Sequence, residues 1–195
     1  MAYATLTQLK SALRLTDSID DTNLTLALNS AEEAINAWCG RTFGSAGTVD
    51  STRYYAAGKA DDVEVDDLTS ITTVEWSRDG STWTATTDYQ AEPLNRYTDG
   101  MTWPITRLRT INAFAWPVMN GVQTVRVTGV YQFGSIPSSV TQAAVLQASR
   151  VFARLSSPLG VAGFADGIGG MYVRGGLDVD VQQLLMPYRR YRAAL

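Results

Sequence analysis

Histidine is absent from this sequence of 195 residues, and cysteine occurs once, at Cys39. Without histidine the chain lacks the commonest general base and metal ligand, and it can form neither a Ser-His nor a Cys-His nucleophile pair. A lone thiol cannot close an internal disulfide, so the fold does not depend on an oxidising compartment. Cys39 lies in an apolar helical pattern, which favours a small core residue over a nucleophile. We therefore expect a chain that is not an enzyme, with no catalytic residue, metal site or cofactor.

Long hydrophobic runs are also missing. No stretch approaches the roughly 18 apolar residues that a membrane span needs, and the first residues do not form a basic and then apolar signal peptide. We expect no membrane partner and a protein that is made and used in solution. With 45% hydrophobic and 18% charged residues, the chain can bury the core of one domain, or of a domain with an insertion.

Lysine is scarce, with only Lys10 and Lys59, and the formal net charge is −3. This charge argues against free nucleic acid as the main partner. The distribution is uneven: residues 1–70 hold five basic and eleven acidic side chains, whereas residues 141–195 hold six arginines and three aspartates. Such polarity would suit head-to-tail stacking of copies.

Helical patterns occupy both ends of the chain. Thr5 or Thr7 can cap a short helix that ends near Leu15. A second helix begins at residues 20–22, where acidic caps suit the helix dipole, and ends before Gly40. A third runs from Ser138 to about residue 155. The apolar stripes of the two long helices have helical spacing, and they consist of Leu24, Leu28, Ala31, Ile35 and Trp38, and of Val140, Ala144, Val151 and Leu155.

Between residues 51 and 133 the pattern changes to period two, with many β-branched residues. Residues 62–66 and 71–76 read as two strands, and residues 106–115 as a third between two prolines. Asp79-Gly80 and Asn120-Gly121 are hairpin turn signals. We predict an antiparallel β unit of five to seven short strands.

The fold class predicted is α+β. The helices of residues 1–50 and 134–195 form a small bundle that is the core domain, and residues 51–133 form an inserted β domain. Residues 160–176 are glycine-dense and read as a mobile loop that becomes ordered on contact with a neighbour. A final short helix is capped by Asp178 or Asp180.

Two clusters allow a second interpretation. Asp61, Asp62, Glu64, Asp66 and Asp67 could bind Ca²⁺, but no calcium-loop spacing accompanies them, and the wet face of a strand with Val63 and Val65 inward is favoured. The tryptophans and tyrosines of the β unit could bind sugars or single-stranded nucleic acid. Without a basic stripe on those strands, core and subunit interface are favoured.

The carboxyl-terminal residues alternate tyrosine and arginine after an apolar helix. That composition is typical of a docking peptide whose arginines form bidentate pairs with acidic groups of a partner. A solvated end without function is the alternative. The docking residues predicted are Tyr188, Arg189, Arg190, Tyr191 and Arg192.

Several local phrases then combine into a family resemblance. They are Leu6–Lys10, Ile19–Asp21, Ala31–Ile35, Val125–Gly134, Ile136–Pro137, Val140–Ala144, Ser157–Gly160 and Asp178–Arg190. In this order the phrases resemble the head-tail connector (adaptor, or head-completion) proteins of long-tailed double-stranded DNA phages. They touch about half of the chain, and none is a catalytic signature. The β unit departs from the smallest, all-helical members of that family.

The resemblance implies a structural virion protein that forms a ring, usually of about twelve subunits, under the portal in the neck between capsid and tail. Assembly would take place in the host cytoplasm. Such a ring extends the DNA channel and is a platform for the next neck or tail protein. Double-stranded DNA passes through it without sequence-specific binding. The helices with the two apolar stripes would build the ring, and the carboxyl-terminal residues would grip the portal. We expect acids of the first helices to line the channel: Asp17, Asp20, Asp21, Glu32 and Glu33.

Two other functions stay open. The chain could be a different neck component, such as a stopper or a tail terminator. From another class, it could be a carbohydrate-binding β module, which predicts exposed, coplanar tryptophans beside polar neighbours.

Overall fold

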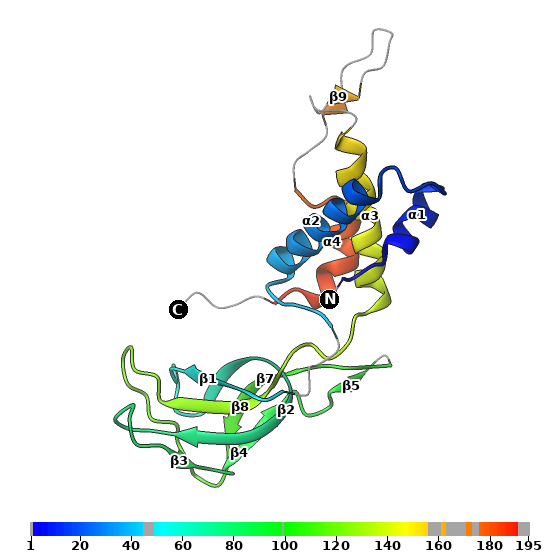
Figure 1. The fold of residues 1–195 in the computed structure, drawn as a ribbon. Coiled ribbons are helices and arrows are strands. Elements are labelled where there is room, and N and C mark those ends of the chain that lie inside the picture. The colour runs from blue at the N-terminus through cyan, green and yellow to red at the C-terminus, as the bar shows by residue number, and fades with distance from the viewer. Residues whose placement is uncertain are drawn as a thin grey trace. The chain divides into compact units, whose positions relative to one another are not determined.

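The structure is a computed structural model, and it describes residues 2–44, 49–98, 100–155, 161–162, 171–172 and 176–190. The described residues fall into two compact units. One, the helical unit, combines the chain ends Met1–Thr42 and Ile136–Leu195, and the other, the β unit, is the continuous segment Phe43–Ser135. Figure 1 shows the helices of the first unit and the sheet of the second. The predicted α+β class is confirmed.

Four helices and a short 3₁₀ turn form the described part of the helical unit. Their bounds are α1 (Leu6–Leu13), α2 (Asp21–Cys39), α3 (Ser138–Leu155), α4 (Val179–Leu185) and η1 (Met186–Tyr188). All four helices were predicted from periodicity and caps. In the described residues no helix combines the length and the apolar character that crossing a membrane requires.

Local capping explains where α1 starts. The Gln8 backbone N–H donates to Thr5 Oγ1 (3.2 Å) and the Thr5 N–H donates to the Gln8 side-chain oxygen (2.7 Å), a capping box that satisfies donors that the first helical turn leaves open. Thr5, not Thr7, is therefore the cap. The helix ends at Arg14, whose left-handed backbone (φ 58°) returns its N–H to Lys10 and Ser11 carbonyls.

The end of α2 follows the sequence signal closely. Gly40 has φ 65° and donates its N–H to the Asn36 carbonyl, as a left-handed helix cap requires. At the other end Asp20 occupies the cap position without a side-chain hydrogen bond. Asp21 in the first turn pairs with Lys10 of α1 at 2.7 Å.

The core of the helical unit is built from small and medium apolar side chains. On α2 the stripe residues Leu24, Leu28, Ala31 and Ile35 are buried, whereas Trp38 is half-buried. On α3 the stripe residues Val140 and Ala144 are buried and Val151 is half-buried; the Leu155 side chain lies outside the described residues. Buried alanines allow α2 and α3 to approach closely: Ala27, Ala31, Ala143, Ala144 and Ala148. Helix α4 packs against α3 and buries Val181 and Leu185.

The β unit has eight strands in the described residues 51–98 and 100–131. They are β1 (Ser51–Tyr55), β2 (Asp62–Trp76), β3 (Thr84–Ala85), β4 (Tyr89–Glu92), β5 (Tyr97–Thr98), β6 (Met101–Thr102), β7 (Ile105–Thr110) and β8 (Val125–Tyr131). Six form an antiparallel sheet in the order β1-β8-β2-β7-β4, with β3 also paired to β2; β5 and β6 form a separate ribbon.

Strand β2 corrects the prediction of two short strands. It runs through 15 residues and pairs with β7 by its first half and with β8 by its second. Register shifts between Glu64 and Leu68, and again near Ser70 and Ile71, mark bulges that bend the strand. The polar residues between the two predicted strands lie at these bulges, so the pattern broke where the strand itself continues.

Two further predictions for this region are wrong. Asn120-Gly121 does form a turn, with Gly121 at φ 73°, but it connects β7 to β8, which are not neighbours because β2 lies between them. The predicted strand over residues 106–115 ends at Thr110, because Asn112 and Ala113 take positive φ (55° and 60°). The Phe114 N–H then donates to the Ile111 carbonyl and closes a turn.

Aromatic and aliphatic side chains fill the β unit. Trp116 is 1% exposed and lies edge-on to Phe114, at 5.0 Å between ring centroids. The valines that alternate along β2 and β8 complete this cluster, and Val63 and Val65 face inward as predicted.

The glycine-dense segment is described only in part. Within it β9 (Val161–Ala162) and β10 (Met171–Tyr172) pair as antiparallel strands, so the loop prediction is wrong for these four residues. The predicted mobility concerns residues that lie outside the described part of the chain.

Candidate functional site

The carboxyl-terminal segment is held by the helical unit's own residues. After α4, Tyr188 is 9% exposed, and its hydroxyl accepts a hydrogen bond from Ser139 Oγ of α3 at 3.0 Å. Asp178 begins α4 as its cap, with its carboxylate accepting the Asp180 N–H. Of the predicted docking residues, Tyr188 is therefore buried in the chain itself.

The next contact fixes the backbone of Arg190. Its N–H donates to the Cys39 carbonyl at 2.8 Å, one of the acceptors that the end of α2 leaves without a helical partner. A Cβ placed on Gly40 would approach the Arg190 carbonyl oxygen to 3.1 Å. Glycine is thus required at this position both by its positive φ and by the proximity of the carboxyl-terminal segment.

The Arg189 side chain lies on an aromatic ring. Its guanidinium carbon is 4.8 Å from the centroid of the Trp38 ring, within cation–π distance, and Arg189 is exposed to solvent. The structure therefore brings Trp38, predicted for the ring helices, together with Arg189, predicted for docking.

Positive charge collects at this end of α2. Residues 34–42 and 181–190 together contain three arginines, Arg41, Arg189 and Arg190, and no acidic residue. The last turn of α2 contains no basic residue of its own, so cations from elsewhere in the chain are favourable beside its partly negative carboxyl end. Burial raises the pKa of the Cys39 thiol to about 11, although Arg41 and Arg189 oppose the shift. The thiol is 0% exposed, so Cys39 is a core residue as predicted.

Sequence reasoning missed Arg41 and the contact of Trp38 with Arg189. No local pattern could have revealed them, since both depend on residues 188–190 returning to the end of α2. Tyr191 and Arg192, the last two predicted docking residues, lie outside the described part of the chain.

The five acids predicted to line a channel do not share one face. Asp17 is exposed and accepts the Ile19 N–H, and Asp21 pairs with Lys10. At roughly 100° per helical residue, Glu32 lies on the same side of α2 as Asp21, whereas Glu33 lies about 120° away. Glu33 is exposed and points away from the buried stripe, while Glu32 and Asp20 are half-buried.

The acidic cluster of β2 is paired with arginines of other strands of the sheet. Arg107 of β7 lies 3.4 Å from Asp62 and 3.7 Å from Glu64, and Arg53 of β1 pairs with Asp66 at 2.7 Å. Among the described residues no three His, Cys, Asp or Glu side chains are arranged to hold a metal ion. These cross-strand pairs give the acids a structural role at the sheet surface.

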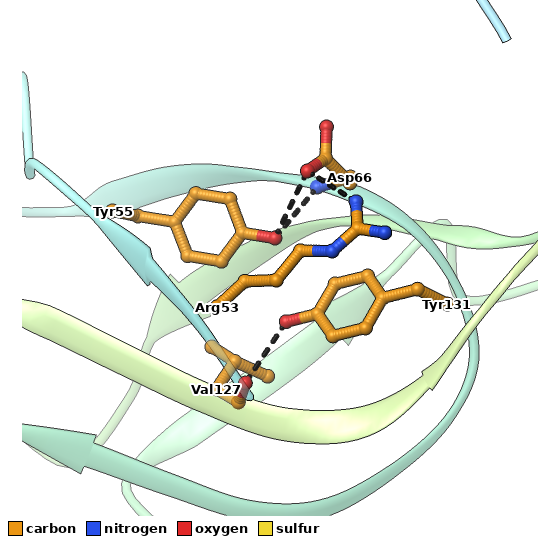
Figure 2. Close-up of polar contacts among 5 residues, drawn as sticks. All are labelled: Arg53, Tyr55, Asp66, Val127 and Tyr131. Atoms are coloured by element: carbon orange, nitrogen blue, oxygen red, sulfur yellow. Dashed lines mark hydrogen bonds and ion pairs between the residues drawn. The ribbon is translucent and has the colours of Figure 1, made fainter. Parts of the chain in front are cut away.

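Figure 2 shows the pair at Asp66 in its surroundings. The Arg53 guanidinium lies over the Tyr131 ring, 4.1 Å from its centroid. Tyr55 accepts the Asp66 N–H (3.2 Å), a donor at the bulge of β2, and Tyr131 donates to the Val127 carbonyl (3.0 Å). Burial raises the pKa of both tyrosines. This network joins the edge strand β1 to β2 and β8.

The tryptophans of the β unit are engaged with other side chains. Trp116 is buried, Trp76 packs against Phe114, and Trp103 packs edge-on against Phe133. Trp83 packs edge-on against Tyr54. The guanidinium carbon of Arg126 lies 4.7 Å from the centroid of the Trp83 ring. Arg126 also donates two hydrogen bonds, of 2.6 and 2.7 Å, to the Glu75 carboxylate. The four tryptophans of the β unit are buried or half-buried, which does not favour the exposed platform of a carbohydrate-binding module.

Comparison with protein families gives one match. Residues 3–74 match the family model described as "Phage gp6-like head-tail connector protein". The predicted resemblance to head-tail connector proteins is confirmed by this match. The matched part of the chain is therefore similar to a family of structural connector proteins. A search of curated proteins found no match.

Solved structures share the fold over nearly the whole chain. The first is titled "Neck of empty GTA particle computed with C6 symmetry" (TM-score 0.57, 16% identity, 98% of this chain and 92% of that chain). The second is titled "Neck of native GTA particle computed with C12 symmetry" (TM-score 0.53, 16% identity, 97% and 90%). The third is the virion of a native gene transfer agent particle (TM-score 0.52, 18% identity, 98% and 92%). The likeness includes both the helical and the β unit.

Proposed function

We propose that this chain is a ring-forming adaptor in the neck of a phage-like particle, between the portal and the next neck or tail protein. Copies would close a ring by head-to-tail contacts, in which each interface joins two different surfaces of the chain. Double-stranded DNA would pass through the ring without sequence-specific binding. The chain acts by binding alone.

The observation that carries this proposal is the match of residues 3–74 to the head-tail connector family. That stretch contains α1, α2 and most of β2. Support comes from the likeness of the complete fold to chains from particle necks, whose titles give C6 and C12 symmetry. Twelve copies is the assembly that we propose on the same basis.

Roles within the ring follow from the surfaces described above. We assign ring contacts to the long helices α2 and α3, and portal docking to the end of the helical unit where Arg189 and Arg190 lie. Of the acids predicted for the channel we retain Asp21 and Glu32, which lie on one side of α2, because like charge beside DNA phosphates disfavours binding and lets the duplex slide. Many weak contacts repeated around a ring give a durable joint.

The test is reconstitution with the portal protein of the same phage. The purified chain, with and without portal rings, is measured by mass photometry and imaged by electron microscopy. We expect rings of the chain stacked coaxially on the portal. A chain that stays monomeric and unbound with portal present would contradict the proposal. Binding only to tail-tube ends would instead identify a tail terminator, and binding only to preformed adaptor rings a stopper.

A further inference from the structure

A two-stranded arm lies at one end of the β unit, as the position of β5 in Figure 1 shows. We define the arm as residues 94–98 and 100–102. It contains β5 and β6, which pair with each other and with no strand of the six-stranded sheet in the described part of the chain. On the arm, Tyr97 is 73% exposed and Leu94 is 66% exposed. The arm therefore presents one large aromatic and one large aliphatic side chain to the solvent.

Hydrogen bonds at the base of the arm hold it in place. The Trp103 N–H donates to the Arg96 carbonyl at 2.7 Å. The Arg96 side chain donates to the Trp103 carbonyl (2.8 Å) and to the Thr69 carbonyl of β2 (3.1 Å). A two-stranded ribbon alone is only marginally stable in water, so these bonds to β2 fix its position. Because the arm is already fixed, Tyr97 loses less freedom when it binds a partner than it would on a flexible loop.

A second exposed apolar surface belongs to the loop between β7 and β8. We define the apolar loop as residues 111–123. The stretch 110–125 contains no charged residue, and within it Ile111, Val118 and Met119 are 37%, 53% and 36% exposed. The Val122 N–H donates to the Met119 carbonyl at 3.1 Å, which closes the turn after these side chains. The loop therefore offers a fixed, uncharged surface.

The sheet places the arm and the apolar loop at opposite ends of one strand. The Thr69 carbonyl that holds the arm lies beside the start of β7, where Leu68 of β2 pairs with Ile105. The apolar loop begins after Thr110, the last residue of β7. At about 3.3 Å per residue, the six residues of β7 separate the two surfaces by about 20 Å. Two different surfaces at opposite ends of one unit are what a head-to-tail contact between copies requires.

We propose that the arm of one copy packs on the apolar loop of the next copy in the ring. Tyr97 lies against Val118 and Met119 of the neighbour, where a flexible thioether adapts its shape to an aromatic ring. In a closed ring every arm and every loop is covered, so that apolar area is removed from water on each copy. The inference rests on the proposed ring, and it adds a contact made by the β unit, which the smallest, all-helical head-tail connectors lack.

The first experiment cross-links neighbouring copies through introduced cysteines beside the contact. Thr98→Cys and Asn120→Cys, both at exposed positions, are made as two separate proteins. Each also carries Cys39→Ala, so that no other thiol is present. The two proteins are mixed, assembled on cognate portal rings and treated with a short bis-maleimide cross-linker. We expect covalent dimers in the mixture and none with either protein alone, because an arm contacts a loop and never another arm.

Lys59 provides a matched control position. It is exposed, and it lies at the same end of the β unit as the apolar loop, because the Ala60 carbonyl accepts the Trp116 N–H at 2.8 Å. Lys59→Cys therefore replaces Thr98→Cys in a parallel mixture with Asn120→Cys. We expect no covalent dimers from this mixture.

The second experiment measures what Tyr97 contributes to ring assembly, followed by mass photometry over a series of protein concentrations with portal present. Tyr97→Asp places a charge in the apolar contact, and we expect assembly to need at least about a tenfold higher concentration. Tyr97→Phe keeps the aromatic ring, and we expect a change within about twofold. The melting temperature should stay the same for both variants, because the side chain is 73% exposed.

The outcomes separate this contact from the adaptor function. Rings that form without cross-linked dimers, or with as many dimers from Lys59→Cys as from Thr98→Cys, would overturn the contact and leave the adaptor function standing. Normal ring assembly by Tyr97→Asp would overturn it too, and a loss of binding to the next neck protein by that variant would assign the arm to that partner instead. A wild-type chain that neither forms rings nor binds portal would contradict the adaptor function itself.

Discussion

Arginines are used differently in the two units of this chain. In the β unit Arg53, Arg107, Arg109 and Arg126 each pair with a carboxylate of another strand, at 2.6–3.4 Å. In the helical unit Arg150 also pairs with Asp178, whereas Arg189 lies on the Trp38 ring. Arginines of the sheet therefore join its strands, whereas Arg189 joins the carboxyl-terminal segment to α2.

The units also differ in how the chain builds them. The β unit is one continuous segment that packs large aromatic residues and pairs strands as far apart in the sequence as β1 and β8. The helical unit needs both chain ends, joined by small side chains. A change in the sheet should therefore affect stability alone. A change that loosens the carboxyl-terminal helix should affect stability and docking together.

The largest effect is expected for Gly129→Ala in β8. A Cβ there would overlap the Ser70 carbonyl oxygen and lie 3.1 Å from Ile71 Cα and Leu68 Cδ2, in a strand that is paired on both sides. Overpacking against backbone atoms costs about 3 kcal/mol. Tryptophan fluorescence during urea unfolding is the measurement, because four of the five tryptophans lie in residues 43–135.

Gly58→Ala is the control for this prediction. Gly58 has ordinary φ, and its Cβ would meet no atom within 4 Å, so we expect a change within about 0.5 kcal/mol. If both substitutions had the same effect, the close packing of β8 on β2 would be wrong. Any Gly129→Ala protein that folds should keep wild-type affinity for the portal.

Leu185→Ala is expected to have the next largest effect, and it affects the helical unit. Leu185 is 0% exposed and fixes α4 just before the segment that carries Arg189. Loss of a buried leucine costs about 2–4 kcal/mol, measured by the helical circular dichroism signal during urea unfolding. The same variant should bind portal more weakly, because the segment that carries Arg189 and Arg190 would no longer be held beside the end of α2. Full affinity in a destabilised Leu185→Ala protein would separate docking from this helix.

Much of the fold was predictable because its signals are local. Within a few residues, Thr5 and Gln8 indicate where a helix starts, and Gly40 indicates where one ends. The apolar stripe from Leu24 to Ile35 indicates which face of α2 is buried. The burial of Val63 and Val65 followed from simple alternation. Each of these needs no knowledge of any distant residue.

The errors arose where distant residues decide. Asn120-Gly121 has the chemistry of a hairpin turn, but β2 separates the strands on either side of it. The bulges of β2 are stabilised by partners such as Tyr55, which the alternation of β2 alone does not reveal. The contacts of the carboxyl-terminal segment were only half visible in the sequence: Arg189 and Arg190 stand out, but Trp38 and the Cys39 carbonyl that they contact lie about 150 residues earlier in the chain.

A smaller effect is expected for Thr5→Ala. The substitution removes the side-chain acceptor for the Gln8 N–H, and loss of a helix cap costs about 1 kcal/mol. The midpoint of urea unfolding, followed by the helical circular dichroism signal, should shift to a lower urea concentration. Portal affinity should be unchanged, because α1 contains none of the residues at the end of α2 or in the carboxyl-terminal segment. Thr5→Ser keeps the acceptor and serves as the control. An equal shift for Thr5→Ser would show that the methyl group, not the cap, is responsible.

The smallest effect at neutral pH is expected for Cys39, because its thiol titrates only at alkaline pH. The pKa of Cys39 is about 11 in the folded chain, against an ordinary 9.0. The neutral thiol is therefore favoured by folding, and its contribution to stability is complete below pH 9 and lost as pH rises toward 11. Cys39→Ala lacks this titration, so the free energy of unfolding of the wild type should fall relative to that of Cys39→Ala over this range. A constant difference between the two proteins from pH 8 to about pH 11 would mean that the thiol is as solvated in the folded chain as in the unfolded one.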